Sequence, residues 1–378
     1  MHFQIHRLLF ARLPFNHELN EFCIATTIHF FALALMAVFL PIFLLQLNYS
    51  IPEIFYYNIL AVFIFLILSP FAAKLAGQIG LRKSILISKP FMIVSLIMLY
   101  FLQTQPALFY PSAVLLGVFW AFFWVPYHLD FTKLSDAKKE GKEIGFFGVL
   151  QNLATFIAPL LGAIVIYSFG FSALFLAASI LLLISVIPLY FADEKIEKTE
   201  IDLSNVFSGK NLKHLIGFMG HGFTGIGAGT VWVLFIFAIL GNYALLGAVS
   251  SISFLVSALI ILLIGIVLDH NNHHKILKIG TLFNTLIWIV KSFANTIGSV
   301  FAFSILANIS DNAAKLPANA ITYDHARQLN PAEQVVVREI GIQTGDIIFM
   351  LIFLFLLQQN YVNGLIVAGL GNLLMWLI

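Results

Sequence analysis

Long apolar segments recur along the chain and are separated by short polar segments. Each is about twenty residues long, which is the number that an α-helix needs to cross the hydrocarbon core of a bilayer. The twelve segments fall at residues 22–45, 54–76, 85–102, 107–127, 145–168, 171–191, 213–240, 243–268, 277–295, 298–321, 335–357 and 361–378. This pattern predicts an all-α integral membrane protein with about twelve transmembrane helices.

The composition supports lipid as the solvent of this chain. Of its 378 residues, 60% are hydrophobic and 10% are charged, whereas a soluble domain carries about 25% charged residues. Cys23 is the single cysteine, so a disulfide framework is excluded. The basic, aromatic N-terminus lacks a cleavage site after a short apolar core, and we interpret it as an interfacial stretch that leads into an uncleaved first span.

The longest polar segment divides the chain into two halves of six spans each. It covers residues 192–212 and mixes acidic and basic side chains. We therefore expect an N-terminal six-helix bundle at 1–191, a cytoplasmic linker at 192–212 and a C-terminal six-helix bundle at 213–378.

The basic residues predict the orientation, because cytoplasmic loops and span ends collect Lys and Arg. With the N-terminus inside, 18 of the 20 Lys and Arg residues fall in cytoplasmic segments. The opposite loops contain none; they are residues 46–53, 103–106, 169–170, 241–242, 296–297 and 358–360. Two lysines remain: Lys315 lies inside span ten, and Lys291 lies near the outer end of span nine, where it is expected to snorkel to the headgroups. Both termini are therefore predicted to be cytoplasmic.

The two halves carry matching segments. AKLAGQIGLRKSI begins at Ala73 and GIVLDHNNHHKIL begins at Gly265, 192 residues later. VPYHLDFTKL and LPANAITYDHA align Pro126 with Pro317 at an offset of 191 residues. Two nearly equal offsets indicate a duplicated six-helix unit.

With these motifs the sequence resembles the major facilitator superfamily, whose loop between spans two and three has a Gly, three residues, an Asp, and then basic residues around a Gly. The first loop departs from this pattern with Ala73 and Gly77 in place of the Gly and the Asp. The resemblance implies two bundles that alternate access to a midplane site, and loops that act as a latch between them. The candidate gating residues are Gly265, Asp269 and Lys275 in the second loop and Gly80, Arg82 and Lys83 in the first.

Polar side chains inside the spans mark candidate functional positions, because a charge at the bilayer centre costs at least about 2.5–3.5 kcal/mol. Span ten has five such residues at spacings of one helical face: Asn308, Asp311, Asn312, Lys315 and Asn319. Asp311 and Lys315 are one turn apart and can pair. The pair is a candidate proton switch, and the alternative is a structural ion pair that joins span ten to its neighbours.

Span four offers aromatic residues where span ten offers charge. At the repeat offset, Trp120 matches Asp311 and Trp124 matches Lys315. In the resembled fold, spans one, four, seven and ten line a central cavity, which implies an aromatic wall facing a polar wall. Such a pocket suits a small amphipathic organic solute. The alternative is that the aromatic residues only pack in the core or face lipid.

Other intramembrane polar residues are further candidates. His221, in the glycine-rich and easily bent span seven, and His29 in span one are candidate proton carriers, with hydrogen-bonded packing as the alternative. Asp346 and Gln343 in span eleven and Gln151 in span five are candidate cavity residues. Arg338 and Glu339, at the mouth of span eleven, are instead assigned to a cytoplasmic charge network.

No motif indicates a metal, a cofactor or nucleic acid. Residues 269–274 (DHNNHH) contain imidazole and carboxylate ligand types, but they lack the helical His-Glu-x-x-His spacing and occupy the latch position. No phosphate-binding loop or nucleophile elbow is visible, which argues against an ATP-driven pump.

The sequence therefore predicts a secondary transporter of a small organic solute, coupled to protons and acting as a monomer in a plasma membrane of the bacterial inner-membrane type. Two alternatives stay open. One is an integral membrane enzyme that acts on lipid, and the other is a transporter-like sensor or scaffold.

Overall fold

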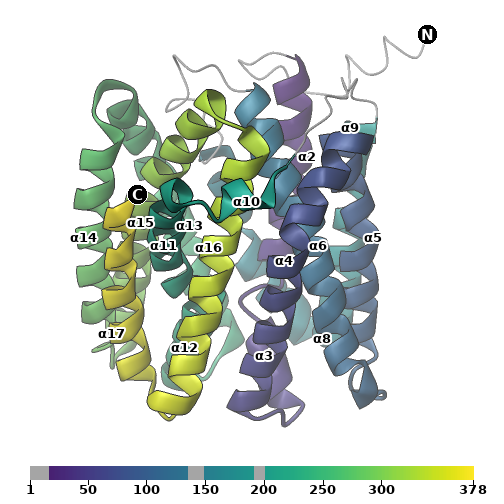
Figure 1. Ribbon diagram of the computed structural model, residues 1–378. Helices are drawn as coiled ribbons and strands as arrows, with labels where there is room; N and C mark the ends of the chain where they lie inside the picture. The colour runs from purple at the N-terminus through teal and green to yellow at the C-terminus, as the bar shows by residue number, and fades with distance from the viewer. Residues whose placement is uncertain (1–16, 135–148, 191–200) are drawn as a thin grey trace.

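The computed structural model describes residues 17–134, 149–190 and 201–378, and the regular structure in these ranges is helical throughout (Figure 1). In the described residues most of the spans predicted from the sequence consist of one helix or of two consecutive helices, and the helix Ala158–Ile184 runs through two of them. In the first half they are α2 (His17–Ala34), α3 (Leu40–Gln46), α4 (Ile51–Ile79), α5 (Leu81–Tyr100), the short η1 (Pro106–Leu108), α6 (Phe109–Leu134), residues 149–155, α8 (Ala158–Ile184) and α9 (Val186–Tyr190).

The second half repeats this arrangement after a short α10 (Leu203–Val206). It contains α11 (Gly209–Phe223), α12 (Ile226–Leu240), α13 (Tyr243–His270), α14 (His273–Lys291), α15 (Ile297–Gln328), α16 (Pro331–Leu351), η2 (Ile352–Leu356), α17 (Tyr361–Asn372) and η3 (Leu373–Leu377). Pro126 lies inside α6 and Pro317 inside α15. The two prolines aligned by the sequence repeat thus occupy the corresponding helices of the two halves.

Seven helical stretches are long and apolar enough to cross a membrane by length and composition alone, among the residues that the structure describes. One of them, Val149–Tyr190, is 42 residues long and contains spans five and six together. The more polar α14 and α15 are not among the seven, because their charged and amide side chains lower the mean hydropathy. In α15 the charged and amide side chains from Asn308 to Asn319 line a cavity inside the bundle, as described below.

Two connections between spans consist of little more than one glycine. Gly80 has φ of 110° and ends α4 at the point where α5 begins. Gly170 has φ of 79° and interrupts α8 between spans five and six, within the predicted loop 169–170. Residues with a Cβ atom rarely adopt such positive φ values, so glycine allows these reversals without extra loop residues.

The two halves meet along two helix pairs, α4 against α16 and α8 against α13. Within the second half, α11 and α16 pack backbone to backbone through glycines. A Cβ atom at Gly222 would lie 2.0 Å from the carbonyl oxygen of Ile342, and one at Gly345 would lie 2.1 Å from that of Met219. Small residues at such crossings allow the close packing on which membrane helices depend.

Each half ties its gating loop to its own bundle by an ion pair at the same place. In the first half Arg82 Nε lies 3.4 Å from Asp130 Oδ2 of α6. In the second half His273 Nδ1 lies 3.0 Å from Asp324 Oδ2 of α15, and this hydrogen bond, outside the predicted span, lowers the pKa of Asp324. The two ties thus join corresponding helices of the two halves, α5 to α6 and α14 to α15.

For the other gating residues the structure gives burial or exposure, which does not test a latch. Lys83 and Lys275 are exposed, Gly265 is buried within α13, and the side chain of Asp269 lies outside the described part of the chain. Their latch role stays a prediction. Lys89 is one of the 18 basic residues that the sequence assigned to cytoplasmic segments. This prediction was wrong, because Lys89 is only 2% exposed and is enclosed by the first bundle.

Candidate functional site

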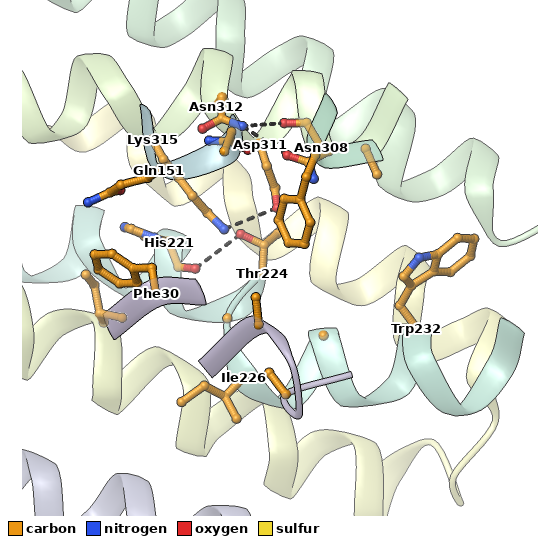
Figure 2. A pocket seen from close by; sticks show the side chains of 18 of the residues that line it. Phe30, Gln151, His221, Thr224, Ile226, Trp232, Asn308, Asp311, Asn312 and Lys315 are labelled. Atoms are coloured by element: carbon orange, nitrogen blue, oxygen red, sulfur yellow. Dashed lines mark hydrogen bonds and ion pairs between the residues drawn. The ribbon is translucent and has the colours of Figure 1, made fainter. Parts of the chain in front are cut away.

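A cavity of about 840 Å³ lies between the two halves (Figure 2). Helices of both halves line it, from α2, α4 and α6 on one side to α11 through α16 on the other. Its volume falls in the range typical of small-molecule sites. Eleven of the twelve predicted substrate or coupling residues line it: Asp311, Lys315, Asn308, Asn312, Asn319, His221, Trp120, Trp124, Asp346, Gln343 and Gln151.

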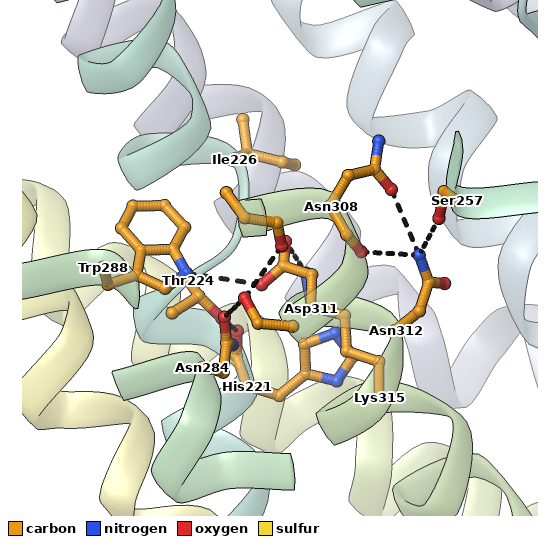
Figure 3. Close-up of polar contacts among 12 residues, drawn as sticks. His221, Thr224, Ile226, Ser257, Asn284, Trp288, Asn308, Asp311, Asn312 and Lys315 are labelled. Atoms are coloured by element: carbon orange, nitrogen blue, oxygen red, sulfur yellow. Dashed lines mark hydrogen bonds and ion pairs between the residues drawn. The ribbon is translucent and has the colours of Figure 1, made fainter. Parts of the chain in front are cut away.

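The polar wall of the cavity comes from α15. Lys315 Nζ lies 3.2 Å from Asp311 Oδ2, and both side chains are about a quarter exposed (Figure 3). Trp288 of α14 donates its indole N–H to the other Asp311 oxygen at 3.3 Å. The Asn312 amide nitrogen donates to Ser257 Oγ at 2.9 Å and to both oxygens of Asn308. Spacings of three and four residues have thus placed one continuous polar face along the cavity.

The aromatic wall comes from α6 and α2. Trp124 packs against Phe30 with ring centroids 5.6 Å apart and stacks on His128 at 5.8 Å. Tyr127 accepts a hydrogen bond from the Gln151 amide at 3.3 Å. Trp120 and Trp124 face the cavity, whereas the neighbouring Phe119 and Phe123 are fully buried inside the first bundle. The aromatic stretch of span four therefore serves both purposes that the sequence left open, cavity lining and core packing.

Span seven is broken at the cavity. α11 ends at Phe223 and α12 begins at Ile226, on either side of Gly225. The carboxylate of Asp346, 1% exposed, accepts the N–H groups of Ile226 at 2.9 Å and Gly227 at 2.8 Å. These are orphan donors at the start of a helix, where a negative charge also meets the positive end of the helix dipole. Asp346 thus stabilises the break.

The cavity end nearest the predicted cytoplasmic side is built from span eleven. Arg338 pairs with Glu339 and donates to Asn319 Oδ1 at 3.0 Å, while the Gln343 amide donates to Glu339 at 3.2 Å. Arg338 and Glu339 are 5% and 2% exposed. The two residues form a charge pair, as their assignment to a charge network implies, and the structure places this pair in the wall of the cavity.

His128 links the halves beside this cluster. Its Nδ1 lies 2.9 Å from the hydroxyl of Tyr323 on α15, and its Nε2 lies 3.8 Å from Glu339. His128 was not among the residues predicted from the sequence, although it stands two residues after the repeat-aligned Pro126. That position was the signal that would have identified it.

Lys291 was also placed wrongly by the sequence. Its side chain does not reach the headgroups, since the residue is 2% exposed and lines the cavity. Nζ lies over the ring of Trp288, 2.9 Å from the centroid, and 4.8 Å from the centroid of Trp232. Two indoles from different helices provide a cation–π environment that competes with the headgroups.

His29 is the one predicted residue that does not line the cavity. It is fully buried in the first bundle, where its Nδ1 lies 2.8 Å from Lys89 Nζ. The rings of Phe119 and Phe123 pack on its imidazole at 5.7 and 4.1 Å. A proton on His29 would therefore have no direct contact with a solute in the cavity. His221, in contrast, lines the cavity with its Nδ1 buried and without a hydrogen-bond partner in the structure.

No group of three or more potential metal-ligating side chains occurs among the described residues. The contacts of the cavity residues are those of a binding site for an organic molecule, with aromatic faces, amides and paired charges.

Comparison with known proteins agrees with this architecture. The family model described as "Major Facilitator Superfamily" matches residues 22–212. The uncharacterized protein YqgE of Bacillus subtilis (strain 168) is 24% identical over 278 residues, which cover 68% of this chain and 64% of that protein. The chain thus spans somewhat less than two thirds of this relative.

Two solved structures share the fold. The human organic anion transporter MFSD10 (TETRAN) superposes with a TM-score of 0.65 over 96% of this chain and 100% of its own, at 12% identity. The Escherichia coli fucose:proton symporter FucP superposes with a TM-score of 0.68 over 94% of this chain and 96% of its own, also at 12% identity.

Proposed function

This chain belongs to the Major Facilitator Superfamily and is a multi-pass membrane transporter, and we propose that it moves a small amphipathic organic solute by alternating access, coupled to protons. The observation that supports this proposal best is the cavity between the halves, where a carboxylate–ammonium pair and an aromatic wall face the same space. Its aromatic faces suit an apolar body, and the amides of α15 suit polar substituents.

Asp311 and Lys315 are the proposed coupling pair. They are paired at 3.2 Å and remain partly exposed to the cavity, so a proton can reach the carboxylate from the cavity. Protonation of Asp311 removes its attraction for Lys315 and leaves the ammonium to seek another partner. A solute that contacts either group competes with this pairing, so solute binding and the state of the pair become linked, which is the requirement for coupling.

We further propose that the bundles 1–191 and 213–378 move against each other about the cavity, with 192–212 as their linker. The glycine contacts within each bundle and the loop ties to α6 and α15 keep each half together during this movement. We also propose a plasma-membrane location, and the lack of Lys and Arg in one set of loops favours an orientation with both termini cytoplasmic.

Membership of a transporter family argues against an integral membrane lipid-modifying enzyme. The sensor or scaffold stays a rival, because the first loop lacks the acidic residue of the family pattern and has Gly77 there. Flux separates the two, since a scaffold binds a solute without moving it.

The test begins with a thermal-shift screen of small organic solutes on the purified protein, followed by flux of each hit in proteoliposomes with and without a proton gradient. We expect Asp311→Asn to retain solute exchange and to lose accumulation driven by the gradient. Asp311→Asn leaves the Lys315 ammonium without its partner in the membrane interior, so Asp311→Asn combined with Lys315→Met should fold better than the single variant and remain uncoupled.

Glu53→Gln is the matched control, because Glu53 is a carboxylate in the first turn of α4, outside the cavity lining. It should accumulate the solute as the unmodified protein does. Undiminished gradient-driven accumulation in the double variant would reduce the pair to a structural contact, and Asp346 or His221 would be tested next.

A further inference from the structure

Lys291 brings an ammonium group into the cavity without a carboxylate beside it. It is the last residue of α14, is 2% exposed, and no carboxylate oxygen lies within 4.0 Å of its Nζ in the described part of the chain. Its contacts are the faces of Trp288 and Trp232. An ammonium at this depth is costly unless an anion or water accompanies it.

The carboxylates that line the cavity are already engaged elsewhere. Asp311 is held by Lys315 and by the indole N–H of Trp288. Glu339 pairs with Arg338. Asp346 accepts two backbone N–H groups at the start of α12. The protein's own anions therefore leave Lys291 as the cation available to a bound molecule.

Trp288 separates Lys291 from the nearest of these carboxylates. Its ring nitrogen donates to Asp311 at 3.3 Å (Figure 3). The Nζ atom of Lys291 lies over its ring face, 2.9 Å from the centroid. One side chain thus positions both charges and keeps them from pairing with each other. The indole face stabilises the ammonium without neutralising it, so the positive charge stays available.

We propose that the cavity binds an organic anion whose carboxylate or sulfonate pairs with Lys291 and whose aromatic or other apolar body lies along Trp120, Trp124 and Phe30. This inference rests on the proposed function only in taking the cavity as the solute site, and it names the chemical class of the solute. A charge-assisted hydrogen bond from an ammonium to a carboxylate is stronger than one between neutral groups, most of all away from bulk water.

The experiment compares two probes of the same shape and different charge, 2-naphthoate and 2-naphthamide. Each is titrated by calorimetry into the full-length protein in lipid nanodiscs, and titrations of empty nanodiscs are subtracted to remove partition into lipid. We expect the unmodified protein to bind naphthoate about tenfold or more tightly than naphthamide.

Lys291→Met should bring the affinity for naphthoate down to that for naphthamide and change the latter by less than about threefold. Lys291→Arg, which keeps the charge, should preserve the preference for the anion. Lys278→Met is the matched control, because Lys278 lies on the same helix with its side chain exposed. If Lys291→Met does not fold, Lys291→Gln provides the same comparison with a polar side chain.

A preference for naphthoate that survives the loss of charge at position 291 would overturn the proposal, as would equal affinity, or no affinity, for the two probes in the unmodified protein. Failure of transport gives a different result. A protein that binds naphthoate through Lys291 and shows no gradient-driven flux refutes proton-coupled transport and leaves the anion site standing. Gradient-driven flux of solutes with no preference for anions would refute the anion site and leave proton-coupled transport standing.

Discussion

The break in span seven makes Asp346 a residue whose replacement should lower the stability of the protein. Its carboxylate accepts the N–H groups of Ile226 and Gly227 and is 1% exposed. Asp346→Ala removes both acceptors at once. Asp346→Asn retains one carbonyl oxygen, which is also a good helix N-cap, but loses the charge that faces the helix dipole.

The magnitude follows from the two donors. A buried donor that loses its partner costs about 1–3 kcal/mol, so Asp346→Ala should lower the free energy of unfolding by about 2–6 kcal/mol. Asp346→Asn should cost about 1–2 kcal/mol, because one of the two bonds to α12 can persist.

The single cysteine supplies the assay. Cys23 lies on α2 with 0% exposure, so a thiol-reactive dye labels it only after the helices separate. Labelling at increasing concentrations of sodium dodecyl sulfate gives the unfolding midpoint of each variant without any added probe. The control is Thr224→Val, because the Thr224 hydroxyl donates to the His221 carbonyl at 3.2 Å and accepts nothing from α12.

We expect the order of stability to be Thr224→Val, then Asp346→Asn, then Asp346→Ala. Equal midpoints for Asp346→Ala and Thr224→Val would refute the capping role. The bonds to Ile226 and Gly227 would then contribute no net stability, and the break would be maintained by glycine packing alone.

Three further predictions concern orientation, gating and packing. In a Cys23→Ala background, an impermeant maleimide should label Asn48→Cys from outside the cell and Asn205→Cys only after permeabilisation, because both positions are exposed and lie in loops of opposite predicted sides. Asp269→Asn should shift the balance of access states and leave solute affinity within about threefold. Gly345→Ala should abolish stable folding, since its Cβ atom would meet the Met219 carbonyl oxygen at 2.1 Å.

Each of these three predictions has an outcome that would contradict it or a control variant. Labelling of position 205 in intact cells would contradict the twelve-span orientation. Access in the Asp269→Asn variant is read from the labelling rate of Ser250→Cys on the cavity wall, and loss of solute binding with unchanged labelling would disprove the latch. Gly298→Ala is the packing control, because nothing lies within 4 Å of its added Cβ atom.

The sequence predicts the features of this fold that depend on local signals. Apolar length located the spans, and helical spacing placed the α15 residues on one face, because both properties belong to a single helix. The repeat offset brought Trp120 and Trp124 to the cavity for a similar reason, since two copies of one unit place equivalent positions alike.

The sequence fails where burial depends on side chains from other helices. Lys89 lies near one end of its span in the sequence. In the structure its ammonium contacts His29 and the ring of Phe123 inside the first bundle. Lys291 lies near the end of its span, where a lysine side chain commonly reaches the headgroups. The contact with Trp232 of α12 favours the cavity over the headgroups, and this contact cannot be read from the sequence of α14. Arg338 and Glu339 were assigned to a charge network at the mouth of span eleven, and only the packing of neighbouring helices shows that the pair lines the cavity. The sequence of a single segment does not show which side chains of other helices will bury a residue.

The glycine connections at positions 80 and 170 have a mechanical consequence. A turn without spare residues cannot stretch, so α4 cannot slide along its axis without carrying α5 with it, and spans five and six are joined in the same way. A displacement of one helix therefore moves the helices joined to it, and this movement must displace the surrounding lipid. Turnover in this chain is expected to slow as the acyl chains stiffen, in a series of liposomes that differ only in lipid saturation.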